Sequence, residues 1–328
     1  MRAALSGWEP PREPALGAWL DDRDDALPAR LVEAGWSELW TGPELLGAAV
    51  AGGVELGSAA APVCLLDEAA LGGALAVSGR VRHGTAAVSA AVPLPGGGLA
   101  LGRLAPEHVR EPTLDGTGTV RAEVADAERL PDREAAACWS AWNAVTLAYF
   151  AGLAGRALDR SVEHARAREQ FGAPLASLPA VQARLADAAL SVDAIGLLAS
   201  AAADTPGGLD APALLWAGDA CSEVTASAHQ VHGAVGFALE TGLHALHRRA
   251  KAVQVWAGRG VRRDALTSAC CGARREISRR RSRRSLARDF TRRERRPRPR
   301  GPPRRDRRGR SPSTRRSAST PSGARPPE

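Results

Sequence analysis

Apolar residues recur at helical spacing along the second half of the chain. In one segment they stand three or four residues apart, at Leu178, Val181, Leu185, Ala188, Val192 and Ile195. Such a stripe forms one face of a helix that packs against other helices. Four such segments predict an antiparallel bundle, with helices over 133–166, 177–203, 211–231 and about 240–257.

The ends of these segments carry recognisable signals. Ser177 is the expected N-cap of the second helix, with Pro179 in its first turn. In the first half of the chain, LPARLVEAGWSELW (27–40) has apolar residues near helical spacing. The next helix is expected to begin at Glu44 and end before Pro62, and its many Ala and Gly residues permit close helix packing.

The pattern changes between these helices. Short Val, Ala and Leu runs separated by Gly and Pro predict several short strands over 76–128, with an Asp-Gly turn at Asp115–Gly116. The predicted fold class is therefore mainly α, with a shortened middle β section. The expected domains are a flexible N-terminus (1–16), a helical N-terminal domain (17–75), a reduced β domain (76–128), a four-helix domain (132–265) and a disordered Arg/Pro/Ser-rich tail (271–328).

Charge is unevenly distributed along the chain. The tail holds 22 Arg, no Lys and five carboxylates, a net charge of +17, so the first 270 residues carry −9 of the total of +8. An Arg run could bind nucleic acid, but the tail has one aromatic residue for base stacking and the body is acidic. Arg-rich sequence without Lys also fits GC-rich DNA translated in a shifted frame, and both origins of the tail stay open.

Cysteine usage and the chain start indicate a reducing compartment. The five Cys form no CxxC pair, so neither a disulfide framework nor a metal site is predicted. The N-terminus lacks the basic-then-apolar order of a signal peptide, and no run approaches the roughly 18 apolar residues of a membrane span. A cytoplasmic protein without a membrane partner is expected.

Three segments of the helical half resemble one family. They are ALDRSVEHARAREQFGAPLASLPAVQARLADAAL (157–190), AHQVHGAVGFALETGLHALHRRAK (228–251) and VQVWAGRG (253–260). Their order and spacing resemble the C-terminal helical domain of the acyl-CoA dehydrogenases. That family has a helical N-terminal domain, a middle β domain and a C-terminal four-helix domain, so the resemblance implies the layout that the patterns predict.

The resemblance implies FAD as cofactor and desaturation of an acyl-CoA thioester between its α and β carbons. A glutamate removes the α proton while a hydride moves to the flavin. Within REQFG, the resemblance implies that Arg168, Gln170 and Phe171 contact the adenosine and pyrophosphate end of FAD, typically across a subunit interface. Arg offers a fork of donors to phosphate oxygens. Gln230 and Gly233 of QVHGAVG are expected to approach the same end, whereas the family gives the position of His232 no chemical role.

The catalytic glutamate of the family is missing from this sequence. Its usual position falls at Ala257, and the alternative position on the first long helix of the domain falls at Trp142. Neither side chain can abstract a proton, so no catalytic residue is assigned. Residues that would hold the flavin of the same subunit are also absent, because Arg259 stands after Gly258 and residues 76–128 lack the expected Thr-Glu-Pro segment.

These features favour an acyl-CoA dehydrogenase-family subunit that completes the FAD site of a related, active chain in a homo- or hetero-oligomer. Its other partners would be an acyl-CoA substrate and an electron-transfer flavoprotein or similar acceptor. One alternative is a self-sufficient enzyme with a displaced base, for which Glu134, Glu163 and Glu240 are the carboxylates considered. The other is a nucleic-acid-binding protein acting through the basic tail.

Overall fold

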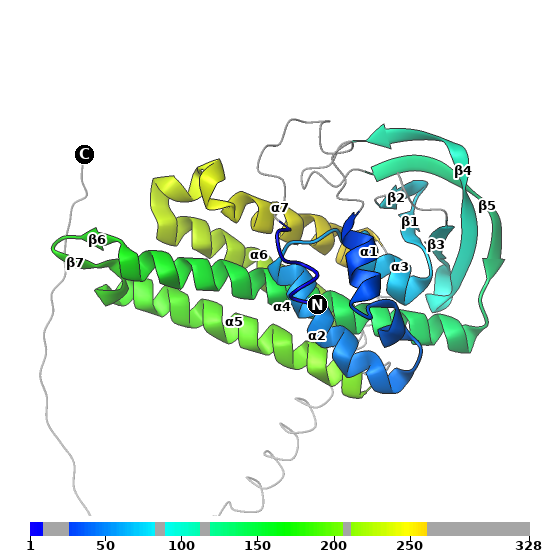
Figure 1. The fold of residues 1–328 in the computed structure, drawn as a ribbon, viewed down its shortest axis with the longest axis horizontal. Helices are drawn as coiled ribbons and strands as arrows, with labels where there is room; N and C mark the ends of the chain where they lie inside the picture. Colours follow the sequence, from blue (N-terminus) through cyan, green and yellow to red (C-terminus); the bar gives the residue numbers. More distant parts are fainter. Residues whose placement is uncertain (9–25, 83–88, 112–118, 206–210, 261–328) are drawn as a thin grey trace, which may run out of the picture. The chain divides into compact units, whose positions relative to one another are not determined.

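A computed structural model describes residues 1–8, 26–82, 89–111, 119–205 and 211–260. Its second half consists of four long helices that run alternately up and down and lie side by side (Figure 1). They are α4 (Asp132–Ala167), α5 (Pro179–Asp204), α6 (Ala211–His232) and α7 (Leu243–Gln254). The mostly helical architecture that the periodicity predicts is confirmed. The predicted domain boundaries stay predictions, and the Arg-rich tail lies outside the described residues.

The ends of two helices differ from the predictions. Ser177 does not cap α5, because its hydroxyl donates a hydrogen bond to the carbonyl oxygen of Pro174 (2.7 Å) and Leu178 is the N-cap residue. Pro179 occupies the first turn, as predicted. The helix expected over 240–257 is shorter. The 3₁₀ turn η7 (Leu239–Thr241) precedes α7, because Gly242 adopts a left-handed conformation (φ 64°) that interrupts the helix.

The middle of α4 forms the centre of the core. Every residue from Trp142 to Ala154 is buried, because α4 packs against α5 and α6 and also against α2 (Leu46–Ser58). The Tyr149 hydroxyl donates a hydrogen bond to the carbonyl oxygen of Ala61 (2.5 Å), so its polar end is satisfied inside the core. α4 therefore joins the C-terminal helices to the N-terminal helices.

The first half holds shorter helices than the sequence predicts. They are α1 (Ala26–Glu33), α2 and α3 (Cys64–Leu71), with 3₁₀ turns η2 (Ser37–Trp40) and η3 (Pro43–Leu45). The helix expected over 27–40 ends at Glu33, because Gly35 has a φ of 81° and Trp36 turns into the core. Residues 1–8, expected to be flexible, pack more closely than predicted, since Ala4 and Leu5 are buried.

Five strands form a small closed barrel in the order β1–β2–β5–β4–β3. They are β1 (Ala74–Val77), β2 (Arg80–Arg82), β3 (Ser89–Pro93), β4 (Leu99–Glu111) and β5 (Thr119–Arg129), and η4 (Pro95–Gly97) joins β3 to β4. β1 and β3 pair in parallel and the other neighbours are antiparallel. Small buried residues such as Ala74, Ala90 and Val120 fill the interior. The predicted Asp115–Gly116 turn lies outside the described residues.

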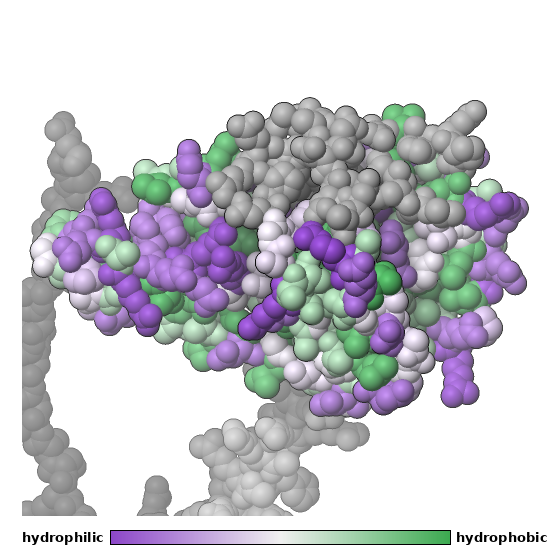
Figure 2. All heavy atoms as spheres, in the orientation of Figure 1, coloured by the Kyte–Doolittle hydropathy of each residue, from purple (hydrophilic) through white to green (hydrophobic). Residues whose placement is uncertain are grey.

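One helix of the bundle is long and apolar enough to cross a membrane by length and composition alone. In α5 only 22% of the most apolar window is buried, which leaves an apolar surface on the outside of the bundle. Figure 2 shows one face of the molecule, on which hydrophilic residues lie both at the end of the bundle that carries the β6–β7 hairpin and over the strands at the other end.

Candidate functional site

The REQFG segment forms a tight hairpin beyond α4. β6 (Glu169–Gln170) pairs antiparallel with β7 (Ala173–Pro174), and the turn residues Phe171 and Gly172 have φ values of 58° and 81°. Positive φ at both turn positions matches a type I′ turn, a conformation that a bulky residue rarely adopts. Phe171 is 93% exposed. The hairpin thus presents an aromatic ring that the described part of the chain leaves exposed.

A cavity lies beside the hairpin, between the end of α4, the start of α5 and the end of α6. Its volume is about 680 Å³. Four of the five predicted cofactor-binding residues line it, namely Arg168, Gln170, Gln230 and Gly233. Phe171 is not among the residues that line it. Gly233 has a φ of 64° where α6 passes into the 3₁₀ turn η6 (Gly233–Phe237), so it also ends the helix. The role of these residues in cofactor binding stays a prediction.

The charges around this cavity are of one sign. Arg168 and Arg184 line it together with His164 and His232, and no carboxylate is among the residues that line it. Amide donors come from Gln170 and Gln230. Guanidinium and amide groups are the donors that phosphate oxygens prefer in proteins. The cavity is therefore suited to an anion with several oxygen acceptors.

The two histidines of the cavity form a stacked pair. The rings of His164 on α4 and His232 on α6 lie 4.2 Å apart between centroids, at an angle of 22°. His232 Nδ1 lies 2.8 Å from the carbonyl oxygen of Ala228. Burial, followed by the neighbouring His232 and Arg168, lowers the pKa of His164 below its usual value. At neutral pH His164 is therefore expected to be mostly uncharged.

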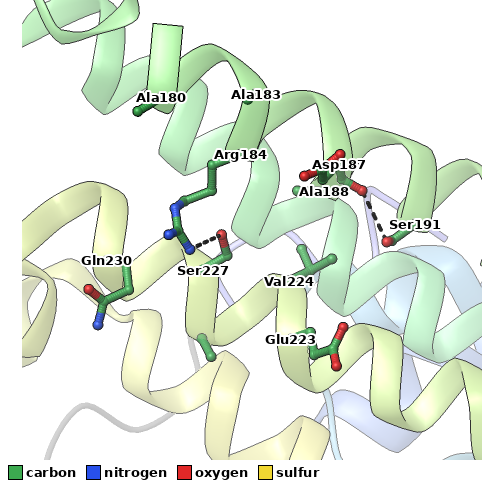
Figure 3. A pocket seen from close by; sticks show the side chains of 11 residues that line it. Ala180, Ala183, Arg184, Asp187, Ala188, Ser191, Glu223, Val224, Ser227 and Gln230 are labelled. Carbon is green, nitrogen blue, oxygen red and sulfur yellow. Dashed lines mark hydrogen bonds between the residues drawn. The ribbon is translucent and has the colours of Figure 1, made fainter. Parts of the chain in front are cut away.

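A shallow groove continues from the cavity along α5 and α6 (Figure 3). Ala180, Arg184 and Gln230 belong to both, and the groove adds small residues and the carboxylates of Asp187 and Glu223. The Arg184 guanidinium donates a long hydrogen bond to the Ser227 hydroxyl (3.4 Å). This weak contact leaves the guanidinium free to meet a ligand at the junction of groove and cavity.

Both positions at which the family resemblance places a base are sealed inside the protein. Ala257 is 1% exposed and Trp142 is fully buried. Ala257 lies in the π-helical turn η8 (Val255–Gly260), next to Trp256. The Arg82 guanidinium lies 5.5 Å from the centre of the Trp256 ring, so a cation from β2 covers this turn. The arrangement leaves no group there that could take up a substrate proton.

Asp67 on α3 is a carboxylate in contact with Arg82 and Trp142 of this region, and no motif or spacing in the sequence singles it out. Arg82 donates to both of its oxygens (2.9 Å to Oδ2 and 2.5 Å to Oδ1). Trp142 Nε1 donates to Oδ1 (2.8 Å), and the Leu75 backbone N–H donates weakly to Oδ2 (3.4 Å). The oxygens of this fully buried carboxylate accept four hydrogen bonds from within the protein, which makes Asp67 a structural group.

The carboxylates considered for a displaced base lie elsewhere. Glu134, Glu163 and Glu240 are all exposed to solvent. None of them lines the cavity or the groove. Within the described ranges, no group of three His, Cys, Asp or Glu residues could hold a metal ion. The described residues therefore form an anion site with no carboxylate among those that line it.

Sequence reasoning missed two residues of the cavity. Arg184 belongs to the polar face of α5, where a solvated charge is the ordinary interpretation. His164 precedes REQFG by one helical turn and carries no motif of its own. Arg168 is the extended C-cap residue of α4, and its backbone N–H donates to the carbonyl oxygen of His164 (2.8 Å), so the end of the helix brings the two residues together.

Comparisons with known proteins agree with this geometry. Residues 141–264 match the family model of the acyl-CoA dehydrogenase C-terminal domain. Over 114 residues the chain is 39% identical to cyclohex-1-ene-1-carbonyl-CoA dehydrogenase of Geobacter metallireducens, covering 33% of this chain and 30% of the relative. It is 33% identical to 3-sulfinopropanoyl-CoA desulfinase of Paraburkholderia xenovorans over the same length, covering 33% of this chain and 29% of the relative. The matched segment spans less than a third of these curated relatives.

Solved structures extend the likeness to the rest of the fold. A variant of the Tcur3481–Tcur3483 steroid ACAD superposes with a TM-score of 0.66 at 20% identity, covering 84% of this chain and 96% of that one. The ChsE4–ChsE5 complex from Mycobacterium tuberculosis gives 0.59 at 20% identity, covering 84% and 94%. Over residues 141–264 the chain is therefore similar to the C-terminal helical domain of the acyl-CoA dehydrogenases, and its described fold resembles these two solved structures.

Proposed function

We propose that this chain is the subunit without a catalytic base in a hetero-oligomeric acyl-CoA dehydrogenase, where it completes the FAD site of a related, active subunit. The observation that carries the proposal is a contrast between two regions of one domain. The cavity beside the hairpin keeps its cationic and amide donors. The region around Ala257 and Trp142 is closed by the chain's own side chains.

The residues of the cavity fit the adenosine and pyrophosphate end of FAD. Arg168 and Arg184 supply fixed positive charge to phosphate oxygens, and Gln170 and Gln230 supply neutral donors. The exposed Phe171 ring would lie against a flat group that the partner or its cofactor brings. Bound FAD supplies the hydride acceptor for α,β-desaturation of an acyl-CoA thioester. The proton at the α carbon must then go to a carboxylate of the partner, because Ala257 and Trp142 cannot accept it.

The exposed side of α5 supports a partner surface. Leu190 and Leu197 are 68% and 71% exposed and stand seven residues apart, so they share one face of the helix. Trp216 at the start of α6 is 45% exposed. Exposed apolar rows of this kind mark contact surfaces for other proteins. The ChsE4–ChsE5 structure is a complex of two named chains, which favours a related subunit as the occupant.

The visible absorbance of the purified full chain tests this proposal. We expect the chain alone to be colourless. After co-expression with an acyl-CoA dehydrogenase encoded beside it, the purified complex should be yellow and should bleach anaerobically with an acyl-CoA such as octanoyl- or cyclohex-1-ene-1-carbonyl-CoA. A chain that is yellow and bleaches by itself would instead establish a displaced base. Salt-sensitive binding of the full chain to DNA or RNA, with no flavin in any complex, would favour the nucleic-acid alternative.

Replacing Arg168 should lower the flavin content of that complex. In Arg168→Ala the cavity loses a charge-assisted donor, and we expect FAD to bind about 10- to 100-fold more weakly. The matched control is Arg166→Ala, because Arg166 is an exposed arginine two residues earlier that does not line the cavity. Flavin absorbance per complex after gel filtration measures both variants. Equal losses in the two would show that general positive charge, and not the cavity, retains the cofactor.

A further inference from the structure

The stacked histidines stand at the wall of an anion cavity rather than in a closed core. His164 and His232 are both partly exposed and both line the cavity that contains Arg168 and Arg184. Their rings come from different helices, α4 and α6, and meet at 4.2 Å. A ligand that enters the cavity therefore meets the edge of the pair together with two fixed cations.

Hydrogen bonding fixes where a proton can be added. A carbonyl oxygen only accepts, so the 2.8 Å contact to Ala228 makes Nδ1 of His232 a donor. The remaining nitrogen, Nε2, is then the one that can take up a further proton. Two charged imidazoles at 4.2 Å would repel each other, so the pair can readily hold one additional proton but not two.

Burial lowers the pKa of His164 first, and nearby cations add to that effect. Along α4 and its C-cap, the charged neighbours of His164 are Arg160, Glu163 and Arg168. Arg160 donates a hydrogen bond to the carbonyl oxygen of Thr241 (2.6 Å), and Glu163 is exposed to solvent. Arg184 stands on α5. On α6, His229 bonds the carbonyl oxygen of Gly236 (2.8 Å) and meets His247 of α7 edge-on. Cations thus predominate near the pair, and a bound anion would reverse the local field.

We propose that the His164–His232 pair takes up one proton when a phosphate-bearing anion enters the cavity, so that the anion binds more tightly as the pH falls. The inference rests on the proposed function for the identity of the ligand, the pyrophosphate of FAD. The anion favours the charged imidazole and so raises its pKa above the lowered value of the free chain. Affinity is then constant above the raised pKa, increases below it and levels off below the free pKa.

Isothermal titration calorimetry of the full chain with ADP-ribose tests this inference. ADP-ribose carries the adenosine and pyrophosphate of FAD, and its pyrophosphate diester does not titrate in the range used. We expect the association constant to rise about tenfold from pH 8.5 to pH 5.5, since each unit of pKa shift corresponds to a factor of ten. Buffers of different ionisation enthalpy should report an uptake of about one proton near the middle of the range.

Two kinds of variant separate the pair from the fixed charges. The double variant His164→Phe/His232→Phe keeps two aromatic rings in the stack but removes both protonation sites, so binding should persist at pH 8.5 and its increase at low pH should be lost or greatly reduced. His164→Gln/His232→Gln serves the same purpose if the larger rings disturb folding. Arg184→Gln is the matched control, and it should weaken binding by a similar factor at every pH.

The possible outcomes distinguish this inference from the proposed function. Binding of ADP-ribose that does not change with pH, or no proton uptake, would overturn the inference and leave the proposed function standing. Absence of binding at every pH would also overturn the inference, whereas the proposed function is tested by the flavin absorbance of the co-expressed complex. A pH-dependent site in a chain whose complexes never contain flavin would support the proton-coupled pair and remove the proposed function.

Discussion

Asp67→Ala should lower the free energy of unfolding by about 3–5 kcal/mol, the range found when one partner of a buried ion pair is removed. Asp67 and Arg82 are 0% and 3% exposed in their side chains. Without the carboxylate, the Arg82 guanidinium remains in the core uncompensated and Trp142 loses its acceptor. Urea unfolding followed by far-ultraviolet circular dichroism measures the loss.

A double variant identifies the cause of that loss. In Asp67→Leu/Arg82→Met both charges are replaced by apolar groups of similar size, and buried pairs replaced in this way often lose little or no stability. We expect the double variant to be markedly more stable than Asp67→Ala. Arg103→Ala is the control for ion pairing in general, because Arg103 and Asp126 are bonded at the surface (75% and 69% exposed) and their loss should not be measurable. A double variant as unstable as Asp67→Ala would show that lost side-chain packing, and not the uncompensated charge of Arg82, causes the loss of stability.

This cluster also marks where sequence reasoning stops. Alignment to the family placed the two base positions at Ala257 and Trp142, but it did not indicate which residues occupy the space around them. Arg82 and Trp142 lie 15 and 75 positions from Asp67 in the sequence. Asp67 itself stands in an ordinary apolar helix, CLLDEAAL, where a solvated charge is the default interpretation. Asp67 is buried because α3, β2 and α4 pack together around it. The apolar pattern of α3 alone does not predict that packing.

The candidate cofactor site was more accessible to prediction because its residues are nearly contiguous. Arg168 and Gln170 are neighbours in one hairpin, and Gln230 and Gly233 lie at one helix end. Arg184 and His164 escaped notice because each lies on a helix face whose periodicity fits a surface charge. The family motifs thus supply the hairpin and the end of α6 that line the cavity. Arg184 and His164 also line it, and they reach it only through the packing of α4 and α5.

Composition predicted one feature of the core directly. The many Ala and Gly residues of α2 indicated close helix packing, and α2 does cross α4 at the distance that glycine permits. A Cβ at Gly57 would overlap the carbonyl oxygen of Tyr149, and a Cβ at Gly152 would overlap that of Val54. Gly53 is nearly as close, since a Cβ there would lie 3.1 Å from the carbonyl oxygen of Val145. The two helices meet backbone to backbone, so no side chain can move aside.

Gly57→Ala and Gly152→Ala should therefore each destabilise the chain by about 2–3 kcal/mol, toward the upper end of the range for overpacked cores. The helices must separate to admit either methyl group, which loosens contacts along the whole crossing. One separation accommodates both groups, so the double variant should lose clearly less than the sum of the two single losses. Chemical denaturation at constant m-value measures all three variants.

Gly196→Ala supplies the control on a helix that is not crossed in this way. Gly196 lies inside α5, and a Cβ there would meet nothing within 4 Å. The substitution should stabilise the chain by about 0.5–1 kcal/mol, because alanine restricts the unfolded chain and favours the helix. If all three single variants shifted stability equally and in the same direction, helix propensity would explain the results and the close crossing would not. Losses at Gly57 and Gly152 beside a gain at Gly196 would assign the effect to the contact between α2 and α4, on which the attachment of the N-terminal helices to the bundle depends.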